Sequence, residues 1–376
     1  MTARALVVGG TGPTGPHVVD GLRRRGFEVT ILHRGTHEVP ELADLEHLHA
    51  DPHFEENVRD VVGDRTFEVV VATYGRLRHV AAALAGRCER FVGVSGVPLY
   101  PGYHEPGSVR PYGMAVAAAE DSVPDTIPGG PGGATSDAAR FAGSIRRAEL
   151  AVLDLHAGGA FAATLFRYPS IYGPRQLYPR DWSVVRRVLD GRRRIILADG
   201  GLTLVTRCAA QNAAAFLLAA LDAPEAAAGE VFNVADRDQY SLRQWVELTA
   251  GFAGGELEVV ALPFDLAGPG RELFPVPHTA HGLVTAEKAR TLLGYVEPVT
   301  AAQALRSTVE WYLEHPPSPS TTERMIDSFD YAAEDRAVVA YHDATATLLR
   351  SQAAASSADH PYAHPTAPGA VDEKGR

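Results

Sequence analysis

Short apolar runs alternate with longer amphipathic stretches from the start of the chain. Residues 5–8 and 28–33 have the apolar character of buried strands, and residues 16–25 between them carry apolar side chains at helical spacing. The same alternation continues, and it predicts strands near 45–50, 67–72, 90–95 and 160–167 and helices at 77–86 and 136–156. Strands that alternate with helices at this spacing indicate an α/β fold with a doubly wound parallel sheet.

The second half of the chain predicts a smaller C-terminal α/β domain. Its short strands and helices run from residue 171 to about 315, where a pair of prolines follows. We therefore expect a first domain at 1–170, to which parts of 203–235 return, and a substrate domain at 171–315. A helical extension is predicted at 316–350. Residues 351–376 are rich in Ala, Ser, Pro and His and predict a disordered tail.

Composition and charge argue against several classes of partner. The net charge of −11 over 376 residues does not suit a nucleic-acid partner, which needs clustered Lys and Arg. No apolar run reaches the roughly eighteen residues of a membrane helix, so no membrane span is expected. The N-terminus enters a strand without a charged leader, and the chain has only two cysteines, Cys88 and Cys208. A cytoplasmic protein without a disulfide framework is the expectation.

The glycine spacing after the first strand predicts a dinucleotide site. Gly9, Gly12 and Gly15 follow an apolar run and open the first helix. In this context the first glycine allows a tight turn, the second lets backbone approach a pyrophosphate, and the third lets the helix pack on the strand. The sheet is therefore expected to be of the Rossmann type. The expected cofactor contacts in this loop are Gly9, Thr11, Gly12, Pro13, Thr14 and Gly15.

Residues at other strand ends complete the expected cofactor site. Arg34 follows the second strand, where an NAD site usually places an acidic residue for the ribose 2′-hydroxyl. An arginine suits a 2′-phosphate instead, so NADP(H) is predicted, with NAD as the alternative. The carboxyl ends of the other strands add Asp51, Ala72, Tyr74, Ser95 and Pro169.

These motifs together resemble the extended short-chain dehydrogenase/reductase family, the NAD(P)-dependent epimerases and dehydratases. The resemblance spans about residues 4–315. Asp51 is similar to the family's adenine-contacting acid, Ser95 lies at its serine-bearing strand end, and Tyr172-Gly-Pro174 is similar to its substrate-entry motif. Glu287-Lys-Ala-Arg290 with Leu293-Gly-Tyr295 resembles its C-terminal end. The resemblance implies a nicotinamide cofactor and a small-molecule substrate.

The catalytic pair of that family is missing from the expected place. The family carries a Tyr and, four residues later, a Lys on the helix predicted at 136–156, where Phe141 and Ile145 stand in the best register. The ammonium there lowers the phenol pKa so that a proton can pass while hydride moves. Neither lysine of the chain, Lys288 or Lys374, lies in the nucleotide-binding half. Another proton donor is therefore required if a proton is needed.

Other side chains become the candidate catalytic residues. Tyr172, Tyr100 and Ser95 are expected near the nicotinamide, and the two phenols are the first candidates for proton transfer. The sugar-nucleotide enzymes of the family carry an acidic pair where this chain has Gln211-Asn212, which weakens a nucleotide-sugar substrate. Arg207 leaves a nucleotide-sugar substrate as an alternative.

Three functions remain open at this point. The first is an NADP(H)-dependent oxidoreductase that reduces a small carbonyl or enone without the usual pair. The second is a non-redox protein of the same fold, either a lyase or cyclase or a cofactor-sensing binding protein, and the third is a nucleotide-sugar epimerase or dehydratase. Relatives of the fold commonly pair two helices, so a homodimer through 77–86 and 136–156 is expected. No metal site is expected, because His278 and His281 have no third ligand at metal spacing.

Overall fold

The computed structural model describes residues 3–36, 39–124, 136–176, 178–273, 276–318, 327–351 and 368. The chain divides into two compact units, Met1–Phe329 and Asp330–Arg376. The second unit contributes one described helix, α12 (Tyr331–Ser351). The predicted disordered tail lies outside the described residues, apart from its first residue and Pro368.

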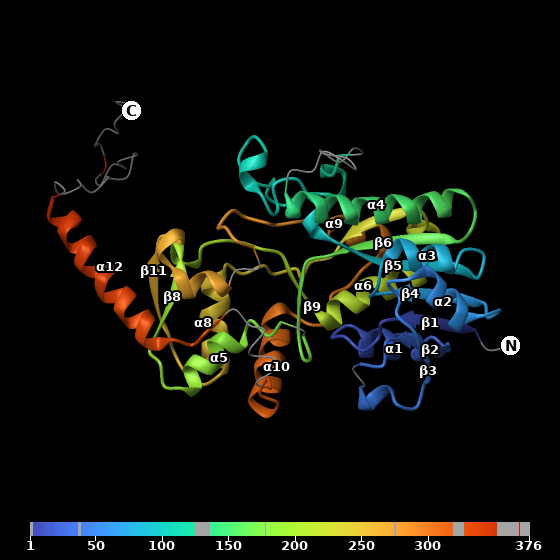
Figure 1. Cartoon of the computed structure of the whole chain (residues 1–376), viewed down its shortest axis with the longest axis horizontal. Coiled ribbons are helices and arrows are strands. Elements are labelled where there is room, and N and C mark those ends of the chain that lie inside the picture. Colours follow the sequence, from blue (N-terminus) through green and yellow to red (C-terminus); the bar gives the residue numbers. More distant parts are fainter. Residues whose placement is uncertain are drawn as a thin grey trace. The chain divides into compact units, whose positions relative to one another are not determined.

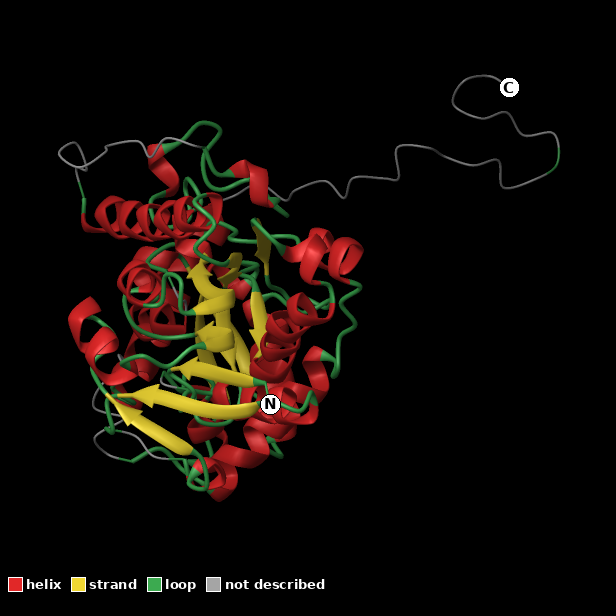
Figure 2. Ribbon diagram, turned by 90° about the vertical axis from the view of Figure 1, so that its right-hand side faces the viewer, coloured by secondary structure: helices red, strands yellow, loops and turns green. Residues whose placement is uncertain are grey.

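A seven-stranded sheet forms the core of the first unit (Figure 1, Figure 2). Its order is β10-β6-β5-β4-β1-β2-β3, and every pair is parallel. The winding reverses between β1 and β4, and in open α/β sheets ligands bind at the carboxyl ends beside such a point. The strands are β1 (Arg4–Val8), β2 (Glu28–His33), β3 (Glu46–His49), β4 (Phe67–Ala72), β5 (Cys88–Gly96), β6 (Ala162–Tyr168) and β10 (Glu230–Asn233).

Helices cover both faces of this sheet, because its strands present apolar side chains on both sides. Helices α1, α6 and α9 pack on one face and α2, α3 and α4 on the other. The long helix α4 begins after Ser136, whose side chain accepts a hydrogen bond of 3.0 Å from the backbone N–H of Ala139. The bounds are α1 (Gly15–Arg24), α2 (Glu55–Val62), α3 (Leu77–Ala83), α4 (Asp137–Ala157), α6 (Ala210–Asp222) and α9 (Glu287–Leu293).

Smaller elements build the part of the unit that lies beyond the carboxyl ends of the main sheet. Two short parallel pairs, β7 with β9 and β8 with β11, lie among helices α5, α8 and α10, which share an aromatic core. Capping boxes at Ser241 and Thr300 begin α8 and α10. The elements are β7 (Ser170–Tyr172), α5 (Trp182–Leu189), β8 (Arg194–Ala198), β9 (Arg207–Ala209), α7 (Pro224–Ala227), α8 (Leu242–Phe252), β11 (Glu258–Leu262) and α10 (Ala301–Glu314).

The predicted fold class is confirmed by the order and direction of the seven strands. Sequence reasoning missed α2 and the three-residue strands β7 and β9, because segments this short carry little periodic signal. The predicted domain boundary at residue 170 stays a prediction. Within the described residues, no helix has the length and apolarity needed to cross a bilayer.

Candidate functional site

The glycine loop has open space for a ligand beside Gly12. Gly9 has φ 106° and its N–H donates to the Leu32 carbonyl at 2.8 Å, which turns the chain sharply out of β1. A Cβ on Gly15 would lie 1.8 Å from the carbonyl oxygen of Gly10, so the start of α1 requires glycine here. A Cβ on Gly12 would meet no protein atom within 4 Å. The protein itself therefore leaves space at Gly12, as the close approach of a pyrophosphate requires.

The other predicted cofactor residues gather around this loop. Ala72, at the end of β4, pairs in register with Val8, at the end of β1. Ser95 is the next-to-last residue of β5, and Pro169 joins β6 to β7. The structure thus brings together, at the carboxyl ends of adjacent strands, Thr11, Pro13, Thr14, Ala72, Tyr74, Ser95 and Pro169.

The residues expected at the adenosine end carry opposite charges. The Arg34 side chain is exposed, and its guanidinium lies 5.5 Å from the centre of the Tyr74 ring. Asp51 accepts hydrogen bonds from the backbone N–H of His53 at 3.0 Å and from His53 Nδ1 at 2.6 Å. These bonds, the backbone one first, lower the pKa of Asp51, so the carboxylate is charged. Its oxygen is engaged by His53, whereas Arg34 forms no ion pair within the described chain.

A cavity of about 760 Å³ lies at the expected nicotinamide end, between β5 and α4. Ser95 and Gly96 form one wall, while Phe141 and Ile145 lie four residues apart on the α4 wall. Tyr168 is the one phenol among the described lining residues, and its hydroxyl donates to a backbone carbonyl at 3.3 Å. Burial raises the pKa of Tyr168. No lysine lines this cavity, so the ammonium that usually activates a phenol is missing among its described residues.

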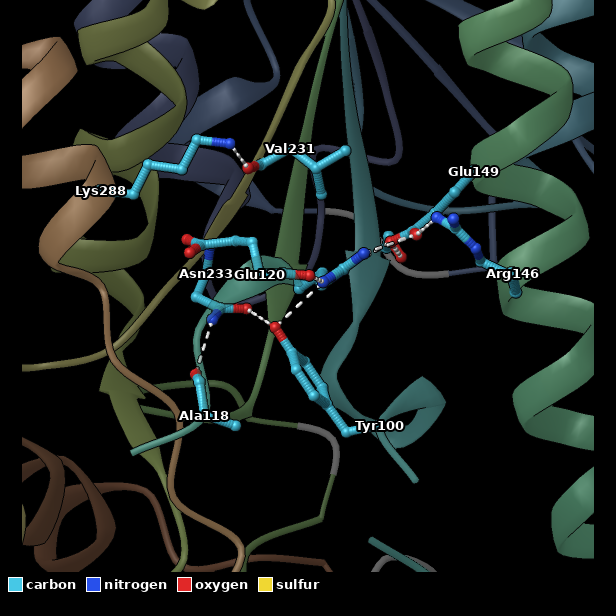
Figure 3. A network of polar contacts seen from close by, with 10 residues as sticks. Tyr100, Ala118, Glu120, Arg146, Glu149, Val231, Asn233 and Lys288 are labelled. Carbon is cyan, nitrogen blue, oxygen red and sulfur yellow. Dashed lines mark hydrogen bonds and ion pairs between the residues drawn. The ribbon is translucent and has the colours of Figure 1, made fainter. Parts of the chain in front are cut away.

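A buried ionic cluster fixes the serine of this cavity from behind. Glu149 is fully buried on α4, and Ser95 Oγ donates to its Oε1 at 2.6 Å. Arg167 of β6 donates to both Glu149 oxygens, at 2.9 and 3.0 Å, and Arg146 donates at 3.2 Å. Figure 3 shows Arg146 reaching Glu149 from the same helix. The four donors leave little freedom to the carboxylate or to the serine that it holds.

The same cluster engages the phenol of Tyr100, one of the candidate catalytic residues (Figure 3). Its hydroxyl accepts a hydrogen bond from Arg167 at 3.0 Å and donates to Asn233 Oδ1 at 2.7 Å. The ring is 2% exposed, and burial raises its pKa. Tyr100 does not line the 760 Å³ cavity. Through these two bonds Tyr100, in the loop after β5, contacts Arg167 of β6 and Asn233 of β10. Its catalytic role stays a prediction.

Tyr172, the other candidate phenol, lines a second cavity of about 260 Å³. Its hydroxyl lies 2.7 Å from Asp236 Oδ2 and 3.2 Å from the Ala301 carbonyl, both of which accept hydrogen bonds. Burial, followed by the nearby Asp236 charge, raises the pKa of Tyr172 far above its ordinary range. A phenol with so high a pKa is a weak acid, and its catalytic role likewise stays a prediction.

The wall of this second cavity contains residues that sequence reasoning did not bring together. Arg180 and Arg207 line it with Ser170 and Trp245. Arg207 begins β9, and its guanidinium lies 4.7 Å from the centre of the Trp245 ring. Arg180 was not among the predicted site residues. An arginine in the loop after the Tyr172 motif was the only signal, and charge in a loop is usually a solvated side chain.

Three histidines meet at the edge of the sheet, on β2 and β3. The Gly35 N–H donates to His33 Nδ1 at 3.1 Å, so the proton of the neutral ring is on Nε2, which donates to His47 Nδ1 at 2.8 Å. His47 Nε2 then donates to the Leu42 carbonyl at 2.9 Å. Ligand atoms of His33, His47 and His49 lie within 4.8 Å of one another. A metal on His33 Nε2 would shift its proton to Nδ1, against the Gly35 N–H, so this hydrogen-bonded chain does not suit a metal.

Comparison with known proteins agrees with this architecture. No family model matches the chain. It is similar to a curated protein, the 3-diazoavenalumate denitrifying reductase of a Streptomyces species, with 28% identity over 304 residues, 78% of this chain and 95% of that protein.

Solved structures show the same fold. UDP-glucose 4-epimerase from Thermotoga maritima superposes with a TM-score of 0.64 at 17% identity, over 83% of this chain and 99% of that one. The dTDP-glucose 4,6-dehydratase from Bacillus anthracis, solved with NAD, gives 0.62 at 18% identity, over 83% and 97%. The fold is therefore that of the NAD-dependent epimerases and dehydratases, the extended short-chain dehydrogenases/reductases, as the sequence motifs predicted.

Proposed function

We propose that this chain, which has the fold of the extended short-chain dehydrogenases/reductases, is an NADP(H)-dependent reductase whose acceptor needs no proton from the protein. The observation that carries the proposal is the α4 wall of the 760 Å³ cavity. Phe141 and Ile145 stand there on one helix face, beside Ser95. Neither side chain can donate a proton, although Ser144 and Arg147 of the same helix also line the cavity.

The glycine loop and Arg34 support the cofactor. The open side of Gly12 suits a pyrophosphate, since a side chain there would meet only the ligand. The exposed guanidinium of Arg34 has no ion-pair partner within the described chain and is free to meet a 2′-phosphate. When bound, the reduced nicotinamide supplies the hydride.

The acceptor class follows from Phe141 and Ile145, which stand where the family carries its tyrosine and lysine. An arenediazonium ion that takes up a hydride at its ring carbon forms a C–H bond while the C–N bond breaks and N₂ leaves with the bonding electrons. The reaction balances without a proton. The relative of 28% identity is named as a denitrifying reductase of a diazo acid, which supports this acceptor class. Ser95, held by Glu149, shapes the cavity wall beside the reacting carbon in this proposal.

An enone or carbonyl acceptor is the second candidate, because Tyr172 lines the 260 Å³ cavity. Its reduction leaves an oxyanion that must be protonated, and Tyr172, Tyr100 or Ser95 would supply that proton. The Tyr172 hydroxyl already donates to Asp236 at 2.7 Å, which favours the first candidate. Both cysteines are free and buried, which supports a reaction in the reducing cytoplasm.

The test follows NADPH absorbance with three acceptors: 4-carboxybenzenediazonium, cinnamaldehyde and an aryl ketone. We expect oxidation of NADPH above the enzyme-free rate with the diazonium, retained in the variants Tyr100→Phe and Tyr172→Phe. Turnover of the enone or ketone that is lost in either variant would favour the second candidate. The variant Gly15→Ala serves as the control whose cofactor loop is disrupted, since its Cβ would lie 1.8 Å from the Gly10 carbonyl oxygen. Binding of NADPH without oxidation in any arm would remove the reductase proposal.

A further inference from the structure

Two arginines face one cavity without a carboxylate partner. Arg180 and Arg207 line the 260 Å³ cavity, and no described carboxylate lies within ion-pair distance of either guanidinium. Arg187, a buried arginine of α5, does have a carboxylate partner. Arg187 donates to both oxygens of Asp327, at 2.5 and 3.2 Å. Neither arginine of the cavity has such a carboxylate partner among the described residues.

The local charge balance is positive. Asp181 is the acidic residue among the described residues that line this cavity, but each of its oxygens already accepts a hydrogen bond. Trp245 Nε1 donates to Oδ1 at 2.7 Å, and Gln176 Nε2 donates to Oδ2 at 3.1 Å. Burial lowers the pKa of Arg180 and of Arg207, and the Asp181 charge only partly opposes it. Two partly buried cations share one carboxylate whose oxygens already accept other hydrogen bonds, so an incoming anion would be stabilised.

Two chain segments connect this cavity with the site of the proposed reaction. Pro13 of the glycine loop lines it, and so does Ser170 at the start of β7. Ser170 follows two residues after Tyr168, which lines the 760 Å³ cavity. In the proposed reaction, the anionic end of the ligand lies at the arginines and its other end lies toward the nicotinamide.

We infer that Arg180 and Arg207 form a subsite for the carboxylate of a planar aromatic or unsaturated acid. The planar fork of a guanidinium matches a carboxylate, and the aromatic rings of Tyr172, Tyr178 and Trp245 line the same cavity. Its 260 Å³ lies below the about 300–1,000 Å³ of sites for larger ligands, which suits a small acid better than a nucleotide sugar. The inference rests on the proposed function for its position beside the reacting carbon, though not for its affinity for an anion.

Isothermal titration calorimetry on the NADP⁺-saturated full chain tests the subsite without any turnover. The probe is trans-cinnamate, and cinnamamide is the neutral analogue of the same shape. We expect cinnamate to bind about 10-fold or more tightly than the amide. Arg180→Gln and Arg207→Gln should each weaken cinnamate by about 10- to 100-fold, because a charge-assisted hydrogen bond is lost. Arg207→Lys should fall between, since it keeps the charge and loses the fork.

Arg186→Gln is the matched control, because Arg186 is an exposed residue of α5 paired with Asp190. Its affinity for cinnamate should equal that of the parent, and NADP⁺ affinity and circular dichroism should be the same in all variants. Equal binding of cinnamate and cinnamamide overturns the inference. Loss of NADP⁺ affinity in the two Gln variants would assign the arginines to the cofactor site and overturn the inference. Displacement of cinnamate by UDP or phosphate at equal concentration would assign them to a nucleotide site and also overturn the inference. Carboxylate binding that persists when no acceptor is reduced would reject the reductase and keep the subsite.

Discussion

Replacing Glu149 by Gln should destabilise the protein strongly, because the carboxylate is the only anion in the described cluster that binds Ser95, Arg146 and Arg167. It accepts four hydrogen bonds of 2.6 to 3.2 Å and is fully buried. A Gln amide keeps one acceptor oxygen and turns its N–H groups toward guanidinium donors. If two charged hydrogen bonds are lost at about 1.5–3 kcal/mol each, the free energy of unfolding falls by about 3–6 kcal/mol. The usual cost of breaking a buried pair, about 3–5 kcal/mol, agrees with this range.

Urea unfolding followed by circular dichroism measures this change, with the slope m compared between variants. The control is Glu247→Gln, which breaks the exposed pair with Arg243 and should cost about 0–1 kcal/mol. In the background Arg167→Met the Glu149→Gln substitution should cost less than in the parent, because one partner is already gone. A loss for Glu149→Gln no larger than that of the control, or strict additivity with Arg167→Met, would refute the reasoning.

Four further predictions concern the cofactor contact, the α4 wall of the cavity, the pH dependence of stability and the oligomeric state. Arg34→Gln should weaken NADPH by about 10- to 100-fold and leave NADH binding unchanged, and equal losses for both cofactors in titrations would reject the 2′-phosphate contact. Phe141→Tyr alone should change little, whereas Phe141→Tyr with Ile145→Lys should gain alcohol-dehydrogenase or epimerase-type activity that parent and single variant lack. Burial lowers the pKa of His278, so its neutral form stabilises the fold above about pH 6.5, and this contribution is lost as the pH falls. Between about pH 7.5 and 5.5 the parent should therefore lose more stability than the variant His278→Gln. Equal losses in the two proteins would contradict this linkage. Light scattering should give a dimer mass, and Leu150→Glu on α4, 36% exposed, should give a monomer; a monomeric parent removes the dimer.

The fold and the glycine loop could be predicted from the sequence because their signals are local. Gly9, Gly12 and Gly15 lie within seven residues of one another, and their spacing alone sets the turn and the start of α1. The strands of the sheet are likewise continuous apolar runs. The neighbouring role of Phe141 and Ile145 follows from their spacing of four on one helix.

The polar partners could not be predicted, because they come from distant parts of the chain. Ser95 and Glu149 are 54 residues apart, and Tyr100 and Asn233 are 133 apart. A tyrosine at a strand end can be placed near a crevice from sequence, but the direction of its hydroxyl depends on such partners. The meeting of Arg180 with β9 has the same origin, since a loop and a strand approach each other only in the folded chain.

The source of the hydrogen in the product tests the central claim most directly. Reduction of 4-carboxybenzenediazonium is run with NADPH deuterated at C4 in ordinary water, and with ordinary NADPH in deuterium oxide, and the benzoate is analysed by mass spectrometry. The account predicts one deuterium in benzoate from the cofactor when both C4 hydrogens are deuterium, and none from the solvent, because hydride moves directly and no proton enters the product. Deuterium from the solvent, or benzoate formed without consumption of NADPH, would contradict it.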